Sequence, residues 1–315
     1  MNDKENVIFR EDTFLSADGK TRVHYYVWRP AEGQPKAVLQ LAHGMCEYVQ
    51  RYDGWARRFC AAGYAFCGND HLGHGHTAPD AEELGYTHPT NGADYLVEDL
   101  HTMTALMTKE FAGVPLVLYG HSMGSFAARV YLTRYGEELA AALISGTAGA
   151  GQPTGIARKL ARGIGSTKGW HHRSRFLTSL AFGSYNKRFR EERSSASWLT
   201  RDTEVQKMYR EDALSHYVFT AAGYDTLFAL LGEVSRKDWA EKVPKTLPVL
   251  VFSGDMDPVG NYGKGTRGVY ERLVKAGCER VTLKLYEGGR HEMHHETNRD
   301  EVFADLVKYL EEVLA

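Results

Sequence analysis

The chain has 315 residues, 43% of them hydrophobic and 25% charged, which suits a globular protein with a sizeable core. Its formal net charge of −2 excludes an overall bias toward nucleic acid or acidic membranes. The polar N-terminus is unlike a secretory signal, and no apolar run approaches the ~20 residues of a membrane span. The four cysteines form no C-x-x-C pair, so we expect reduced thiols in a cytoplasmic protein.

The first predicted elements are two strands, residues 7–14 and 22–28, that alternate apolar and polar side chains on either side of a turn. Short apolar runs typical of buried strands follow at residues 37–42, 65–67, 116–119, 141–144, 249–252 and 281–285. Apolar residues at three- and four-residue spacing predict helices at residues 52–62, 95–111, 125–135, 265–276 and 300–314. This alternation predicts a mostly parallel sheet with helices on both faces, preceded by an antiparallel hairpin.

Residues 149–241 interrupt the alternation of strands and helices. They contain short helix-like stretches with Gly and Ser breaks and no strand-like run. We interpret them as a helical cap inserted into one sheet domain, whose two parts are residues 1–148 and 242–315. Residues 151–210 carry thirteen Lys and Arg against four Asp and Glu, an excess of nine positive charges.

A serine nucleophile is predicted at Ser122, in the motif Gly120-His121-Ser122-Met123-Gly124. The motif follows an apolar strand and precedes a helix, and in that context G-x-S-x-G forms a sharp turn that exposes the serine hydroxyl. The backbone N–H of Met123 would then lie at a helix N-terminus, where it can donate to an oxyanion.

A serine hydroxyl needs a base, and the base needs an orienting acid, which in this fold follow the serine in the order acid, then histidine. Asp255 and Asp257 are both candidates for the acid, because both lie just after an apolar strand. His291, after the last predicted strand, is the candidate base. Its neighbours Glu292, His294, His295 and Glu296 raise the question of a metal site, but their spacing is not H-E-x-x-H, and we expect no metal.

A second oxyanion donor is expected from the turn that follows the strand at residues 37–42. Met45 is the candidate, and Gly44 before it allows the backbone to approach a substrate closely. We expect His43, Gly44 and His121 to contact the substrate. Cys46, in the same turn, is interpreted as a packed residue rather than a nucleophile, since no second histidine motif accompanies it.

Five motifs in this order resemble the monoacylglycerol lipases and lysophospholipases, which belong to the α/β-hydrolases of serine aminopeptidase type. The motifs are His43-Gly44-x-x-Glu47 with Arg51-Tyr52, Asp70-His71-x-Gly73-His74-Gly75, Gly120-His121-Ser122-Met123-Gly124, Gly254-x-x-Asp257-Pro258 and His291-Glu292-Met293-His294-x-Glu296. The resemblance implies an α/β-hydrolase fold with a mostly parallel eight-stranded sheet, and it implies Asp257 rather than Asp255 as the acid. One departure is Ser125, where the family often has a second glycine.

The resemblance implies a cofactor-free hydrolase of carboxylic esters that works through an acyl-enzyme on Ser122. We expect a monoacylglycerol, a lysophospholipid or a short acyl ester as substrate, no nucleic-acid partner, and transient contact of the basic cap with a membrane surface. Two alternatives stay open: a peptidase or amidase of the proline iminopeptidase type, and a binding protein without catalysis. The basic cap counts against the first, since holding a substrate amine usually takes acidic groups. The complete triad counts against the second.

Overall fold

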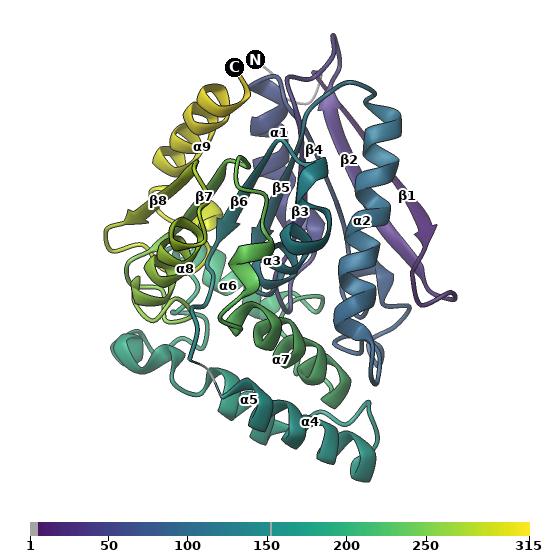
Figure 1. Cartoon of the computed structure of the whole chain (residues 1–315). Helices are drawn as coiled ribbons and strands as arrows, with labels where there is room; N and C mark the ends of the chain where they lie inside the picture. The colour runs from purple at the N-terminus through teal and green to yellow at the C-terminus, as the bar shows by residue number, and fades with distance from the viewer. Residues whose placement is uncertain (1–5, 152) are drawn as a thin grey trace.

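The computed structural model describes residues 6–151 and 153–315 (Figure 1). Residues 1–5 and residue 152 of the cap lie outside this part. Most of the expectation about the N-terminus rests on residues 1–5. The strands are β1 (Val7–Leu15), β2 (Arg22–Pro30), β3 (Val38–Ala42), β4 (Ala65–Asn69), β5 (Leu116–His121), β6 (Ala141–Ser145), β7 (Val249–Gly254) and β8 (Val281–Tyr286). They form one sheet in the order β1-β2-β4-β3-β5-β6-β7-β8.

The predicted hairpin and the mostly parallel sheet are both confirmed. β1 pairs with β2, and β2 with β4, in antiparallel register, while all strand pairs from β4 through β8 are parallel. Each predicted strand falls within or next to an observed one, with ends that differ by one to two residues. The sheet can be predicted because its central strands are short, mostly apolar runs, which are typical of a parallel sheet covered on both faces.

Strand β3 shows how the two faces of the sheet are filled. Successive side chains of a strand point to opposite faces. Val38 and Ala42 pack into one apolar cluster, and Leu39 and Leu41 into the other. Gln40 is also buried, and its amide bonds the carbonyl of Leu100 and the hydroxyl of Thr104 at 2.8 and 2.9 Å.

Helices cover both faces of the sheet (Figure 1). The core helices are α1 (Asp53–Ala61), α2 (Gly92–Glu110), α3 (Met123–Tyr135), α8 (Lys264–Lys275) and α9 (Arg299–Leu314). α1 and α9 supply one of the two apolar clusters, while α2, α3 and α8 supply the other. The core is therefore a three-layer sandwich that holds the ends of β3, β5 and β7 at one edge.

The cap lies in the chain between β6 and β7, and in Figure 1 its helices α4 and α5 lie below the sheet. Its helices are α4 (Thr154–Lys168), α5 (Arg175–Phe182), the 3₁₀ segment Tyr185–Glu192, α6 (Thr203–Glu211) and α7 (Ala221–Ser235). Polar side chains cap the N-termini of α5, α6 and α7. Ser174, Asp202 and Thr220 accept hydrogen bonds from N–H groups of the first turn of these helices. α7 packs against both α4 and the core helices α2 and α3, so it joins the cap to the sheet domain.

Within the described ranges, no helix has the length and apolar character needed to cross a bilayer.

Candidate active site

Ser122 lies on the sharp turn between β5 and α3. Its backbone has φ 54° and ψ −122°, a strained conformation for a residue with a side chain. Two hydrogen bonds hold this turn: the N–H of Ser122 donates to the carbonyl of Ser145 at 3.0 Å, and the hydroxyl of Ser125 donates to the carbonyl of Ser122 at 2.5 Å. Ser125, the departure from the family pattern, thus reinforces the turn from within the helix.

The glycines on either side of Ser122 are needed because other chain segments approach closely. A Cβ atom on Gly120 would lie 2.6 Å from the Cβ of Ala128 on α3. A Cβ atom on Gly124 would lie 2.0 Å from the carbonyl oxygen of Ala42, at the end of β3. Any larger residue would push strand, turn and helix apart, so the glycines let Ser122 sit at the edge of the sheet.

His291 and Asp257 come together from two loops at the same edge of the sheet. The Nδ1 atom of His291 lies 3.0 Å from a carboxylate oxygen of Asp257, and both residues are buried. Asp255, the other candidate acid, accepts instead from the backbone N–H of Gly288 at 2.8 Å. The structure therefore brings His291 to Asp257 and not to Asp255.

Hydrogen bonds hold the carboxylate of Asp257 in place, and the carboxylate in turn orients the imidazole of His291. The hydroxyl of Ser253 and the backbone N–H of Val259 each donate to Asp257 at 2.8 Å. Burial lowers the pKa of His291, but the charge and hydrogen bond of Asp257, together with the charges of Glu292 and Glu47, raise it above its ordinary value. With Nδ1–H donating to Asp257, the Nε2 atom of His291 is the one free to take a proton.

Ser122 and His291 line one cavity, which we call the polar cavity, of about 920 Å³. Its polar lining includes Glu47, His121, Thr178, Ser195, Tyr209, His216, Tyr217, Tyr224 and Glu292. Among the described contacts, no hydrogen bond joins the hydroxyl of Ser122 to the imidazole of His291. Such bonds are often long in an enzyme without substrate and tighten when the substrate binds.

A second cavity, the apolar cavity of about 740 Å³, meets the first at Met45, Ser122 and Phe182. Its lining is almost wholly apolar and includes Met123, Phe126, Ala148, Ala157, Leu180, Leu227, Phe228, Leu231 and Val259. Ser122 thus stands where an apolar chamber and a polar chamber join.

The turn that carries Met45 lies directly against Ser122. A Cβ atom on Gly44 would be 2.9 Å from the Cβ of Ser122. The backbone N–H of Gly44 donates to the carboxylate of Glu47, and Cys46 has a positive φ of 55°, so the turn is tightly folded. Met45 and Met123, the two predicted oxyanion donors, both border the apolar cavity beside Ser122.

The two histidines predicted to contact substrate have different surroundings. His121 borders the polar cavity, and its ring centre is 4.8 Å from that of His291. His43 is fully buried and does not border either of these two cavities; its Nε2 accepts the backbone N–H of His71 at 3.0 Å, and its Nδ1 lies 2.8 Å from the carbonyl of Gly44. Burial lowers the pKa of both rings, so His43 braces the turn at Gly44 as a neutral imidazole.

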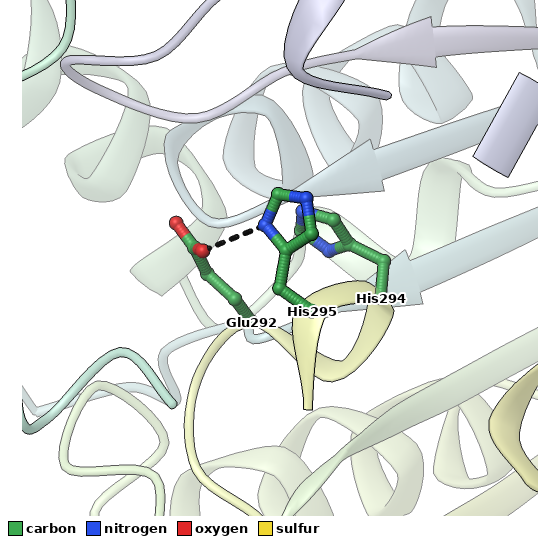
Figure 2. Close-up of side chains that lie close together, drawn as sticks. All are labelled: Glu292, His294 and His295. Atoms are coloured by element: carbon green, nitrogen blue, oxygen red, sulfur yellow. Dashed lines mark hydrogen bonds and ion pairs between the residues drawn. The ribbon is translucent and has the colours of Figure 1, made fainter. Parts of the chain in front are cut away.

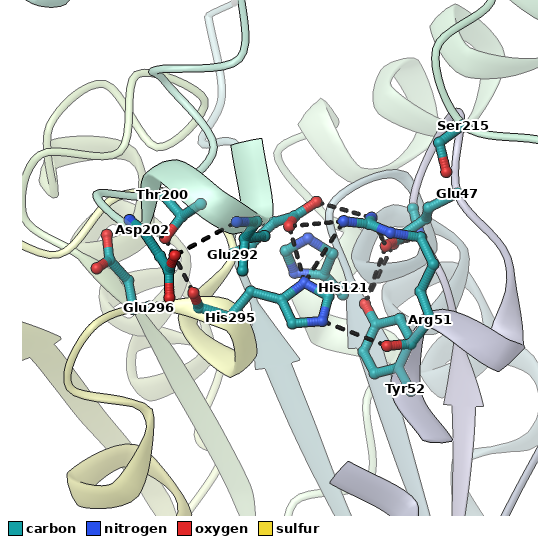
Figure 3. A network of polar contacts seen from close by, with 12 residues as sticks. Glu47, Arg51, Tyr52, His121, Thr200, Asp202, Ser215, Glu292, His295 and Glu296 are labelled. Carbon is teal, nitrogen blue, oxygen red and sulfur yellow. Dashed lines mark hydrogen bonds and ion pairs between the residues drawn. The ribbon is translucent and has the colours of Figure 1, made fainter. Parts of the chain in front are cut away.

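A buried ion network links the turn at Gly44 to the loop of His291 (Figure 3). Arg51 donates to Glu47 at 3.0 Å and to both carboxylate oxygens of Glu292 at 2.9 and 3.0 Å. Burial raises the pKa of Glu47, which Arg51 offsets only in part. Burial acts the same way on Glu292, but Arg51 and His295 outweigh it and hold its pKa well below the ordinary value.

Glu292, His294 and His295 form the one potential metal cluster found among the described residues (Figure 2). Both oxygens of Glu292 are already bound by Arg51, and one also contacts His295 at 3.0 Å. The ring of His294 stacks on Tyr52 with centroids 4.2 Å apart. A dication here would face the adjacent guanidinium charge, so the donor set fits an ion-pair network better than a metal.

The cap contributes site residues that were not predicted from the sequence. Trp198 lies with its ring centre 5.0 Å from that of His291, and Phe182 and Tyr185 pack beside Trp198. Phe182 lies in the apolar run at residues 176–182, but that run shows helical spacing like any amphipathic helix. Only the folded cap shows that its aromatic side chains cover the base.

Comparisons with known proteins agree with this geometry. The family model described as Serine aminopeptidase, S33 matches residues 33–298. A monoacylglycerol lipase of Mycolicibacterium smegmatis is 29% identical over 96% of this chain and 97% of its own, and the human monoglyceride lipase is 29% identical over 90% and 83%. The crystal structure of a thermostable carboxyl esterase from Bacillus coagulans in complex with glycerol superposes with a TM-score of 0.91, at 27% identity over 98% of this chain and 99% of that one. The chain therefore belongs to the serine aminopeptidase S33 family of α/β-hydrolases.

Proposed function

We propose that this protein is a serine hydrolase that cleaves carboxylic esters, with Ser122 as nucleophile, His291 as base and Asp257 as orienting acid. The hydroxyl oxygen of Ser122 attacks the ester carbonyl while its proton passes to Nε2 of His291. The resulting imidazolium is stabilised by Asp257, whose contact at 3.0 Å supports the assignment.

The tetrahedral intermediate then collapses, and the bond between the carbonyl carbon and the leaving oxygen breaks. His291 returns its proton to that oxygen, which departs as the alcohol. Water repeats the sequence on the acyl-enzyme and releases the carboxylic acid. The backbone N–H groups of Met45 and Met123 hold the oxyanion, and losing one such donor typically costs ~3 kcal/mol of transition-state stabilisation.

The substrate class follows from the junction of the two cavities at Ser122, the observation that carries the proposal. The apolar cavity suits an acyl chain, and the hydroxyl-rich polar cavity suits a hydroxylated leaving group. We therefore propose a single-chain lipid of the monoacylglycerol or lysophospholipid type, or a short acyl ester, as substrate. Gly44 and His121 would contact it, while the buried position of His43 favours a supporting role.

The decisive experiment combines a fluorophosphonate probe with a series of p-nitrophenyl esters and monoacylglycerols of increasing chain length. We expect the probe to label Ser122, and Ser122→Ala to lose roughly 10³–10⁶ in kcat while it stays folded. Ser166→Ala, an exposed serine on α4, is the matched control and keeps full activity. A folded wild type that resists the probe would instead favour the binding protein without catalysis.

A peptidase is the second candidate, because the family description names an aminopeptidase. A substrate amine needs an available carboxylate, and Glu47 and Glu292 of the polar cavity are both occupied by Arg51. The excess of cations in the cap also repels an amine. We therefore expect amino-acid p-nitroanilides to be cleaved more slowly than acyl esters, and the reverse ranking would make the peptidase the better assignment.

We also propose that the cap touches lipid surfaces while the enzyme works. Four large apolar side chains of cap helices are exposed: Ile156 and Leu160 on α4, and Phe176 and Leu180 on α5. Cations lie on the same helices, so the surface offers both apolar area and attraction to anionic headgroups. If this is correct, binding to vesicles that contain anionic lipid weakens as salt rises, whereas equal binding at low and high salt removes the electrostatic part.

The cytoplasm is the compartment we propose. The described cysteines Cys46, Cys60, Cys67 and Cys278 are free thiols, which supports a reducing environment.

A further inference from the structure

Arg129 is a buried cation for which the mechanism has no use. It lies on α3, seven residues after Ser122, and its side chain is 1% exposed. Within the described chain its hydrogen-bond partners are all neutral oxygens. Burial and the nearby Arg272 lower the pKa of Arg129 to about 9, so it still carries its charge at neutral pH. An uncompensated buried charge is destabilising, so the presence of one here calls for a role.

The contacts of Arg129 reach the segment before the cap and the last α-helix of the cap. One terminal nitrogen donates to the hydroxyl of Thr147 at 3.2 Å and to the carbonyl of Ala148 at 2.9 Å, where the chain leaves the sheet for the cap. The other donates at 2.8 Å to the carbonyl of Val234, in the last turn of α7. The guanidinium also lies 4.2 Å from the ring centre of Trp239.

The α7 end of this contact has a clear physical basis. The last carbonyls of a helix lack partners within the helix and carry the negative end of its dipole. Arg129 binds the carbonyl of Val234 from inside the protein, while Arg272 of α8 binds those of Ser235 and Arg236 from outside, at 3.3 and 3.0 Å. Of these two arginines, Arg129 alone also contacts the segment that leaves the sheet.

Both segments that Arg129 holds are walls of the apolar cavity. Ala148 borders this cavity, and so do Leu227, Phe228 and Leu231 of α7. Because Arg129 bonds both segments, it fixes the separation between two of the walls that line the space beside Ser122. A small change in that separation alters how well a long chain fills the cavity, whereas a two-carbon chain needs little of it.

We propose that Arg129 is a positioning residue that sets the acyl-chain preference of the enzyme by holding the Ala148 segment and α7 at a fixed separation. The proposal rests on the ester hydrolysis proposed above and adds a determinant of specificity to it.

The test compares Arg129→Met with wild type on p-nitrophenyl acetate, octanoate and dodecanoate. We expect kcat/KM for the acetate to stay within about twofold, and for the dodecanoate to fall about tenfold through a higher KM. Arg129→Lys, which keeps the charge and reaches part of the same carbonyls, should recover part of the loss. An equal fall for all three esters, or no change for any, overturns the proposal.

Two further variants guard against a merely structural effect. Arg134→Met removes a cation from the same helix, where Arg134 forms surface ion pairs with Asp94, Glu98 and Glu233, and it should leave the chain-length profile unchanged. Should Arg129→Met not fold, Thr147→Val removes a single acceptor and should shift the profile in the same direction by a smaller factor. An unchanged profile in Thr147→Val then overturns the proposal.

Amide hydrogen exchange separates this proposal from the proposed function, since it needs no turnover. Arg129→Met should exchange faster than wild type in peptides that cover residues 146–151 and 230–236, with α2 as an internal reference. Unchanged exchange in both peptides overturns the role of Arg129 even if esters are cleaved. Faster exchange in a protein that cleaves no ester would support the role of Arg129 in holding the two segments, and it would contradict the proposed ester hydrolysis.

Discussion

The sheet core and the cap helices α4 and α5 differ in how far their side chains are buried. In the core, β3 and β5 are buried along their whole length, and Asp257 and His291 are at most 1% exposed. In the cap, α5 buries only Leu177, while Ile156 of α4 and Phe176 of α5 are 66% and 57% exposed. The contrast supports the proposal that the buried core holds the reacting groups in place, while the cap decides which esters reach them.

The two regions also differ in how their charges are paired. The core site pairs its charges internally, since Arg51 forms buried ion pairs with both Glu47 and Glu292. The cap has nine excess cations in residues 151–210, but part of that excess has partners elsewhere in the fold. Arg158 and Arg162 both pair with Asp225, and Arg201 pairs with Glu296. The cap surface is therefore less basic than its sequence suggests.

After Ser122→Ala, the largest expected effect in the core is that of Asp257→Asn. Without this charge the imidazole loses its orientation, and we expect kcat to fall roughly 10⁴-fold for every ester. The base works only when neutral, so wild-type kcat/KM should rise with pH through the pKa of His291. Since Asp257 raises that pKa against the effect of burial, the midpoint of the variant should move to lower pH. A midpoint that moves upward would contradict the assigned pair.

A smaller loss, again shared by all esters, is expected for Gly44→Ala. The new Cβ would lie 2.7 Å from Glu47 and 2.9 Å from the Cβ of Ser122, so the turn that carries Met45 must move. A displaced oxyanion donor should lower kcat about 10²-fold, measured with both short and long esters. Gly54→Ala on α1 is the control, because its Cβ would meet nothing within 4 Å. Full activity in Gly44→Ala would argue against an oxyanion role for this turn.

A change in the cap should separate substrates instead. Phe176→Ser removes an exposed apolar side chain, and we expect about a fivefold loss on monoacylglycerol presented in vesicles, with soluble p-nitrophenyl acetate unaffected. Val274→Ser, which changes an apolar residue that is 45% exposed on α8, serves as the control and should change neither rate. Equal losses on both substrates in Phe176→Ser would contradict the proposal that the exposed cap residues act on lipid-borne substrates and not on the chemistry.

The smallest effect is expected from Asp225→Asn, within the cap itself. Asp225 is buried, and its two arginine partners on α4 are partly exposed, so the loss in stability should be about 1 kcal/mol. Thermal unfolding should detect it, while hydrolysis of p-nitrophenyl acetate stays at the wild-type rate. A loss of short-ester activity would mean that the cap also supports the chemistry.

Much of the fold could be predicted from the sequence because its signals are local. Buried parallel strands appear as short apolar runs, helices as three- and four-residue spacing, and the turn at Ser122 as a motif between the two. The order of Ser122, Asp257 and His291 along the chain, together with the resemblance to known hydrolases, was enough to single out the three residues. Their contacts required the folded loops, in which Gly254 packs so closely on Gly289 that a Cβ would lie 1.9 Å from its carbonyl oxygen.

What only the tertiary structure decided depends on residues far apart in the chain. The hydrogen-bond partners of Arg51 lie up to 244 residues away, and those of Arg129 up to 105, so neither role leaves a pattern in any short window. The same holds for Trp198, whose ring centre lies 5.0 Å from that of His291. The sequence by itself determined the sheet, the turn at Ser122 and the class of chemistry, because these depend on local backbone requirements. The folded chain decided the two cavities and the walls of the cap, because these form only where distant segments pack together.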